Sequence, residues 1–230
     1  MAAKRGDRGG ARLGELGPLP GGHHGLSREQ ILESQRERLL AAVAQEVAAK
    51  GYRGTTITDI VKLASVSTRD FYEHFGGKEE CFLAAFEAVR DHLEGVLTEA
   101  AAAEPGWPGQ TVAVLRAGLE FFAAEPDLAR LCVVEPVSAT PTIAIRFREV
   151  VLACVPALAR GRAESAEAAA LPESTEDSLL GGIVSLATRS ILAGETEQLP
   201  TLLPSLVEFT LSPYLGAERA AALAGQSGTT

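Results

Sequence analysis

The stretch GYRGTTITDIVKLASVSTRDFYEHFGGK, residues 51–78, decides the fold of this chain. Twice in this stretch a hydroxyl residue stands three positions before an aspartate, at Thr56 and Asp59 and again at Ser67 and Asp70. This spacing is typical of a helix start, because each side chain can satisfy a free backbone N–H group. We therefore expect one short helix to begin after Thr56 and a second after Ser67.

The two helices are predicted to pack together around a sharp turn at Ser65 and Val66. Their apolar residues recur at three- and four-residue steps, with Ile60, Leu63 and Ala64 on the first helix and Phe71 and Phe75 on the second. Two short helices joined in this way, with Val66 filling the corner, form a helix-turn-helix. Its core is too small to stand alone, so neighbouring helices must cover it.

Long helices are expected on both sides of this motif. Ser27 suits the N-cap of the preceding helix and Gly51 its end, while Lys78 opens the helix that follows. Further helices are predicted over residues 111–124, 126–134, 140–160 with a kink at Pro156, 179–192, and 201–212 after a Thr201 cap. No stretch alternates with period two between hairpin turns, so we predict an all-α chain.

Composition excludes several classes of protein. Of the 230 residues, 46% are apolar, which is too many for a disordered or collagen-like chain. The longest apolar run, residues 150–159, is far shorter than the roughly 20 residues of a membrane span, so no membrane contact is expected. Cys81, Cys132 and Cys154 are widely spaced in apolar stretches, which favours buried reduced thiols in a cytoplasmic protein.

The net charge of −9 is divided unevenly. Residues 1–78 carry 12 basic and 9 acidic side chains, whereas residues 79–230 carry 9 basic and 21 acidic ones. Such asymmetry favours a polyanion as the partner of the N-terminal part, with a solvated acidic surface as the alternative. Residues 1–26 are predicted to be a disordered basic arm, either a passive tail or a source of phosphate contacts. Within it, His23 and His24 have no further ligands nearby, so no metal site is expected.

No pattern of catalytic residues occurs. The chain has no nucleophile elbow, Walker loop, zinc-protease motif, dinucleotide fingerprint or Cys-x-x-Cys pair, and only four histidines. We therefore predict no catalytic residues, no cofactor and no enzymatic activity.

The second helix of the motif is predicted to read DNA. A helix fits the major groove, and this helix presents its N-terminal turn to the base edges. The candidates for base contacts are Thr68, Arg69, Asp70 and Glu73. Arg69 can pair with guanine, the acidic side chains can accept from cytosine N4, and Thr68 can meet a thymine methyl group. Asp70 as a cap alone and Glu73 as a solvated charge are the alternatives.

Phosphate contacts are expected from hydroxyl and basic groups around the same helices. The candidates are Thr56, Thr58, Ser67, Tyr72, His74 and Lys78. Tyr72 is the strongest, because Phe71 and Phe75 face inward and leave its hydroxyl free. Thr56 and Ser67 also serve as caps, and His74 as a packed surface histidine is the alternative to a contact.

Residues 51–78 closely resemble the signature of TetR-type transcriptional regulators, and the resemblance covers about 50 residues with a compatible helical remainder. The matches are Gly51-Tyr52, Thr56-Ile57, Ile60, Ala64, Val66-Ser67, Phe71-Tyr72, His74-Phe75 and Lys78-Glu79. Two positions depart from the pattern, because Ser65 replaces the usual turn glycine and Val61 the usual alanine. A left-handed conformation at Ser65 would cost on the order of 1 kcal/mol.

The resemblance implies a homodimer formed through the last two predicted helices, near 176–193 and 201–212. Both carry apolar stripes, at Leu179, Ile183, Leu186 and Ile191 and at Leu202, Leu203, Leu206 and Phe209. Periodicity alone leaves open whether these stripes meet a partner or the chain's own core. A two-fold dimer would present its reading helices to half-sites about 34 Å apart.

The resemblance also implies a small-molecule effector of unknown identity. A domain made mostly of Ala, Val and Leu, in a chain with eight Phe, favours an apolar or amphipathic effector. The candidate effector-binding residues are Trp107, Arg116, Phe121, Phe122, Cys132, Glu135 and Phe147, with Arg146 and Arg189 beside them. The aromatic residues and Cys132 have plain core positions as the alternative. Arg116 and Glu135 are the better clues, because a buried polar group needs a partner or a ligand.

Four segments follow from these arguments: the arm 1–26, a helix-turn-helix DNA-binding domain 27–78, a helical effector-binding and dimerisation domain 79–216, and a C-terminal tail 217–230. The chain is predicted to be a homodimeric repressor that binds a palindromic double-stranded DNA operator and is released by the effector. Activation is the alternative to repression, because the outcome depends on where the operator lies. The alternative is a helical protein-interaction or ligand-binding module that keeps the fold without sequence-specific DNA binding.

Overall fold

The computed structural model describes residues 27–227, which are mostly helical and contain no strand, so the predicted all-α class is confirmed. The arm 1–26, including His23 and His24, lies outside the described residues. The elements are α1 (Arg28–Gly54), α2 (Ile57–Ala64), α3 (Thr68–His74), α4 (Lys78–Ala102), α5 (Trp107–Ala124), α6 (Pro126–Ala129), the π-helix η1 (Arg130–Val134), the 3-10 helix η2 (Glu135–Val137), α7 (Pro141–Leu152), α8 (Val155–Ala159), the 3-10 helix η3 (Arg160–Ala163), α9 (Ala166–Ala169), α10 (Thr175–Leu192), the 3-10 helix η4 (Thr196–Leu202), α11 (Leu203–Leu215) and α12 (Ala217–Ser227).

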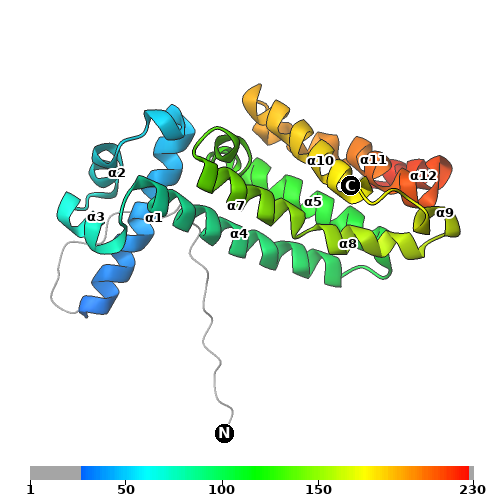
Figure 1. The fold of residues 1–230 in the computed structure, drawn as a ribbon, viewed down its shortest axis with the longest axis horizontal. Coiled ribbons are helices and arrows are strands. Elements are labelled where there is room, and N and C mark those ends of the chain that lie inside the picture. The colour runs from blue at the N-terminus through cyan, green and yellow to red at the C-terminus, as the bar shows by residue number, and fades with distance from the viewer. Residues whose placement is uncertain (1–26, 228–230) are drawn as a thin grey trace, which may run out of the picture.

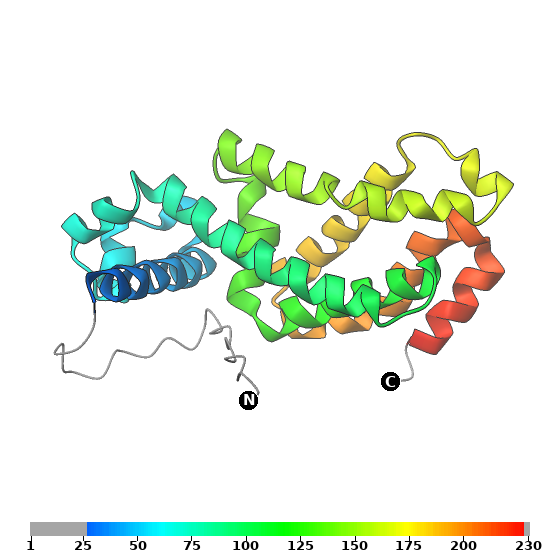
Figure 2. The ribbon, with the colours of Figure 1, turned by 90° about the horizontal axis from the view of Figure 1, so that it is seen from below.

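The helices form an N-terminal head, residues 27–78, and a larger body, residues 79–227 (Figure 1). The head contains α1, α2 and α3. From the head, α4 extends into the body, where it packs along α5. Figure 2 shows α7 and α8 following one another along one side of the body. The helix-turn-helix is thus held at one end of the molecule.

One hydrophobic core joins the head to the body. Phe71 of α3 and Phe75, which caps its end, are buried, as the sequence predicts. They belong to one cluster that includes residues of α1 and α4 and continues to Tyr214 in α11. At the junction the rings of Tyr52 and Phe82 meet edge to face, with centroids 5.3 Å apart. The contact between head and body is therefore packed, and α4 is the chain connection through it.

The C-terminal end differs from the prediction. Residues 217–227 form α12, not a tail, and Ala220 and Ala224 are buried as α12 packs on α11. An alanine-rich stripe allows close packing but gives a weak apolar signal, which explains the difference. Thr201 lies inside η4 and does not cap α11, which begins at Leu203 and runs through Pro213.

The predicted helix 140–160 is divided, and this division changes the setting of one cysteine. α7 ends at Leu152 and α8 begins at Val155, just before Pro156, whose nitrogen carries no hydrogen to donate. Cys154 at this break is exposed, so its predicted burial is wrong, while Cys81 and Cys132 are buried free thiols. Burial raises the pKa of the Cys81 thiol to about 12.

Two further properties concern residues 27–227 only. Their histidine, cysteine and acidic side chains form no group that could hold a metal ion. None of the described helices combines the length and apolar character needed to cross a membrane.

Candidate nucleic-acid interface

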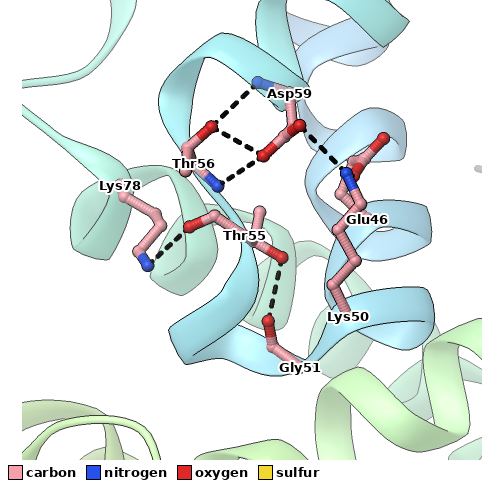
Figure 3. Close-up of polar contacts among 7 residues, drawn as sticks. All are labelled: Glu46, Lys50, Gly51, Thr55, Thr56, Asp59 and Lys78. Carbon is pink, nitrogen blue, oxygen red and sulfur yellow. Dashed lines mark hydrogen bonds and ion pairs between the residues drawn. The ribbon is translucent and has the colours of Figure 1, made fainter.

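The start of α2 is fixed by the predicted capping box (Figure 3). The Thr56 hydroxyl accepts a hydrogen bond from the Asp59 N–H at 3.2 Å, and the Asp59 carboxylate accepts from the Thr56 N–H at 2.9 Å. The Lys50 ammonium lies 2.9 Å from the same carboxylate and 2.6 Å from that of Glu46. The Thr56 hydroxyl, followed by Lys50, lowers the pKa of Asp59 to about 2. These local contacts fix α2 against α1.

The turn and the start of α3 also follow the sequence. Ser65 adopts the left-handed conformation (φ 51°, ψ 47°), and the Ser67 hydroxyl accepts from the Asp70 N–H at 3.1 Å. Arg38 of α1 donates to the carbonyls of Ala64 and Ser65, at 2.8 and 3.2 Å. Sequence reasoning missed Arg38, because 26 residues separate it from Ala64 and no local pattern links them.

The candidate base-contacting residues lie together on the outward turns of α3. Thr68, Arg69 and Glu73 are exposed, and the Arg69 side chain keeps 88% of its surface in solvent. Asp70 is half-buried beside its cap. The Arg69 guanidinium lies 3.5 Å from the Glu73 carboxylate, an exposed pair that stabilises little in water. Arg69 is therefore available to another partner.

The candidate phosphate-contacting residues divide into exposed and engaged groups. Tyr72 is 56% exposed while its neighbour Phe71 is fully buried, which confirms the predicted orientation. Thr56, Thr58 and Ser67 are exposed, although the hydroxyls of Thr56 and Ser67 serve as caps.

His74 and Lys78 have partners within the head. His74 Nε2 lies 3.3 Å from the Gln35 side-chain oxygen. The Lys78 ammonium donates to the carbonyls of Tyr52 and Thr55, both at 2.7 Å, and lies 4.2 Å from the centre of the Tyr52 ring. Burial lowers the pKa of Lys78. Lys78 thus joins the start of α4 to the end of α1 (Figure 3).

Three candidate effector-binding residues have partners inside the body. The indole nitrogen of Trp107 donates to the carbonyl of Ala157 at 2.9 Å. The Trp107 ring also packs edge to face on the Tyr214 ring, with centroids 5.0 Å apart. Arg116 donates to the carbonyl of Ser227 at 3.2 Å. Cys132 is buried in the core, which raises its pKa. These contacts account for their burial without a ligand.

Glu135 contacts the head, not a pocket in the body. Its carboxylate accepts from the backbone N–H of Tyr52 at 2.8 Å and lies 3.5 Å from the Arg130 guanidinium. The sequence identifies Glu135 as a buried polar residue that needs a partner, which the structure confirms. Its partner lies 83 residues away, beyond the reach of any local pattern.

The other candidates in the body are less enclosed. Phe121 and Phe122 meet edge to face, with ring centroids 5.3 Å apart, and both are half-buried, as is Phe147 on α7. Arg146 pairs with Glu87 of α4 and with Glu149, whereas Arg189 is exposed. The structure thus spreads the candidate effector residues over several elements of the body.

Comparison with known proteins finds a family model that matches part of this chain. Residues 39–85 match the family described as bacterial regulatory proteins, tetR family. The HTH-type transcriptional regulator TcmR of Streptomyces glaucescens is 32% identical over 62 residues, which cover 27% of this chain and 27% of that relative. The chain therefore spans about a quarter of the length of this curated relative.

Solved structures extend the likeness to the body. The fatty acid degradation regulator FadR from Bacillus halodurans aligns with a TM-score of 0.68 and 16% identity, covering 78% of this chain and 94% of that one. FadR from Bacillus subtilis, solved in complex with stearoyl-CoA, aligns with a TM-score of 0.64 and 16% identity, covering 78% and 97%. At such identities the likeness concerns the fold. Residues 39–85 thus carry the signature of the tetR family of bacterial regulatory proteins, and the chain as a whole shares the fold of these solved regulators.

Proposed function

We propose that this chain is a homodimeric transcriptional regulator of the bacterial cytoplasm that binds duplex DNA through α3. The observation that carries the proposal is the outward turn of α3, where Arg69 is almost fully exposed on a helix anchored by buried Phe71 and Phe75. A rigid helix with an exposed arginine at its N-terminal turn suits the major groove, where arginine pairs with guanine. Tyr72 on the same helix is exposed beside this turn and is proposed to contact a phosphate.

The dimer is proposed to form through the outward faces of α10 and α11. Phe209 of α11 is exposed and its ring reaches Gly182 of α10, where an added Cβ would lie 2.7 Å from the ring. Leu192 at the end of α10 is also exposed. Because a two-fold dimer presents the same helix twice, its operator would be an inverted repeat with half-sites about one helical turn apart.

The effector is proposed to be apolar or amphipathic and to act by releasing the DNA, which makes the protein a repressor. The rings of Phe121, Phe122 and Phe147 pack against the hydrophobic core but are only half-buried, so part of their apolar surface is left uncovered. A protein of similar fold was solved with stearoyl-CoA, so long-chain acyl-CoA is the first class to test, with free coenzyme A as the control.

The first experiment is selection of random duplex DNA by the purified protein, followed by titration of the enriched sequence at several salt concentrations. We expect an inverted repeat bound much more tightly than scrambled DNA, with affinity falling as salt rises. Absence of enrichment by the folded, ligand-free protein would contradict the proposal and favour a helical interaction or ligand-binding module.

Two variants of α3 separate base contacts from phosphate contacts. Arg69→Ala is expected to relax the preference at one base step by about 1–3 kcal/mol. Tyr72→Phe keeps the ring but removes the hydroxyl, so it is expected to weaken binding to all sequences alike. Equal losses on cognate and scrambled DNA for Arg69→Ala would exclude Arg69 as a base-contacting residue.

A further inference from the structure

α1 is interrupted near its end, at Gly51, next to a residue that forms a hydrogen bond with the body. Gly51 has a positive φ of 73°, and the next N–H, that of Tyr52, points to the Glu135 carboxylate at 2.8 Å. An added Cβ at Gly51 would lie 3.4 Å from the same carboxylate oxygen. The break in α1 and the carboxylate therefore fit each other closely.

Tyr52 is held from two directions. The body approaches its N–H group through Glu135, which is only 7% exposed. The start of α4 approaches its carbonyl through the Lys78 ammonium. Within residues 27–227, the contact between Tyr52 and Glu135 is the one hydrogen bond that joins the head to the body beyond α4 and its first turn.

Glu135 also lies at an irregular point of the body. It follows the π-helix η1 and begins η2, and α6, η1 and η2 all pack against α1. Single π-helical turns are rare and occur frequently at functional sites. A change in this segment would move the Glu135 carboxylate, and Tyr52 with it.

We propose that Glu135 is a positioning residue that sets the angle of the head on the body, so that a shift of residues 130–137 reorients α3. The proposal rests on the proposed DNA-binding function, because orientation matters when two heads must meet two half-sites at once. Glu135 would couple a shift of residues 130–137 to the orientation of the head, and it would do so through its hydrogen bond to Tyr52.

A distance measurement tests the angle without DNA. One spin label is placed on the exposed native Cys154 and one on the exposed α2 residue through Lys62→Cys, while Cys81 and Cys132 are buried. The labelled chains are diluted with unlabelled protein, so that the measured distances are those between two labels of the same chain. We expect a narrow distribution for the parent and for Glu135→Gln, which keeps an acceptor oxygen, and a broad one for Glu135→Ala.

Two further variants keep the outcome decisive. Glu135→Asp keeps the charge but is one methylene too short to reach Tyr52, so it is expected to broaden the distribution even if the alanine variant fails to fold. Glu176→Ala is the matched control, because Glu176 is a 2% exposed carboxylate bonded within the body to Arg162 and Tyr214. A distribution that stays narrow in Glu135→Asp, or broadens equally in Glu176→Ala, would overturn the proposal.

The selected operator provides the second measurement. Glu135→Ala, or Glu135→Asp in its place, is expected to weaken operator binding by about fivefold or more. The variant should also discriminate less between the operator and versions whose spacer is one base pair longer or shorter. Unchanged affinity and spacer discrimination would overturn the proposal. If the parent protein binds no DNA, the proposed function fails, and the distance distributions still decide the role of Glu135.

Discussion

The head and the body reach the same all-helical structure by different means. Each head helix begins at a side chain that caps it, Ser27 for α1, Thr56 for α2 and Ser67 for α3. The four longest helices of the body, α4, α5, α10 and α11, begin without a side-chain cap. In the body such caps begin shorter helices, at Thr140 for α7 and Ser165 for α9. The long helices of the body depend instead on contacts between distant segments.

Those distant contacts are polar as well as apolar. In the body, Glu176 of α10 accepts from Arg162 of η3 at 2.8 Å and from the Tyr214 hydroxyl of α11 at 2.9 Å. Trp107 at the start of α5 reaches the Ala157 carbonyl in α8. Because these partners lie 14 to 50 residues apart, the body forms only when several helices have assembled.

The largest expected effect tests whether local signals suffice in the head. Phe71→Ala removes a fully buried ring and is expected to lower the free energy of unfolding by about 3–5 kcal/mol, measured by urea unfolding. The neighbouring Tyr72→Ala removes a ring that is mostly in solvent, so its cost should stay below about 1 kcal/mol. Equal costs for the two variants would show that the caps, not the core, determine head stability.

In the body, two glycines separate close packing from helix preference. A Cβ at Gly161 would overlap the Trp107 ring, whereas one at Gly95 in α4 would meet nothing within 4 Å. We expect Gly161→Ala to lower the free energy of unfolding by about 1–3 kcal/mol and Gly95→Ala to raise it by about 0.5–1 kcal/mol. Thermal unfolding of both variants measures this. A stabilising Gly161→Ala would mean that the Trp107 ring moves aside easily.

The same division explains what the sequence predicts and what it does not. The helix starts at Thr56 and Ser67, the burial of Phe71 and the exposure of Tyr72 depend on neighbours within four residues, so periodicity and capping predict them. The contacts of Arg38, Lys78 and Glu135 join residues 23 to 83 positions apart, and no local pattern contains that information. The α12 helix likewise depends on packing, because its buried Ala220 and Ala224 give a weak apolar signal.

Ser65 is the head position where the residue type opposes the backbone conformation, and substitutions there test the cost of this strain. Its φ of 51° is left-handed, which glycine adopts at no steric cost, although glycine loses more chain entropy on folding. Ser65→Gly is therefore expected to raise the free energy of unfolding by about 0.5 kcal/mol, whereas the β-branched Ser65→Val lowers it. A loss of stability with glycine would show that Arg38 holds the turn strongly enough to remove the strain.

The smallest effect concerns acid and the cap of α2. The pKa of Asp59 is lowered from 3.8 to about 2, first by the Thr56 hydroxyl and then by Lys50. A carboxyl group whose pKa is lower in the folded state stabilises the fold above its unfolded pKa and loses this contribution as the pH falls toward the folded value. The melting temperature is therefore expected to decline between about pH 4 and pH 2. Asp59→Asn keeps an acceptor oxygen for the Thr56 N–H but does not titrate, so its melting temperature should fall less over that interval. An identical decline in both proteins would assign the acid sensitivity to the carboxylates of the body, such as Glu87, whose pKa the Arg146 guanidinium also lowers.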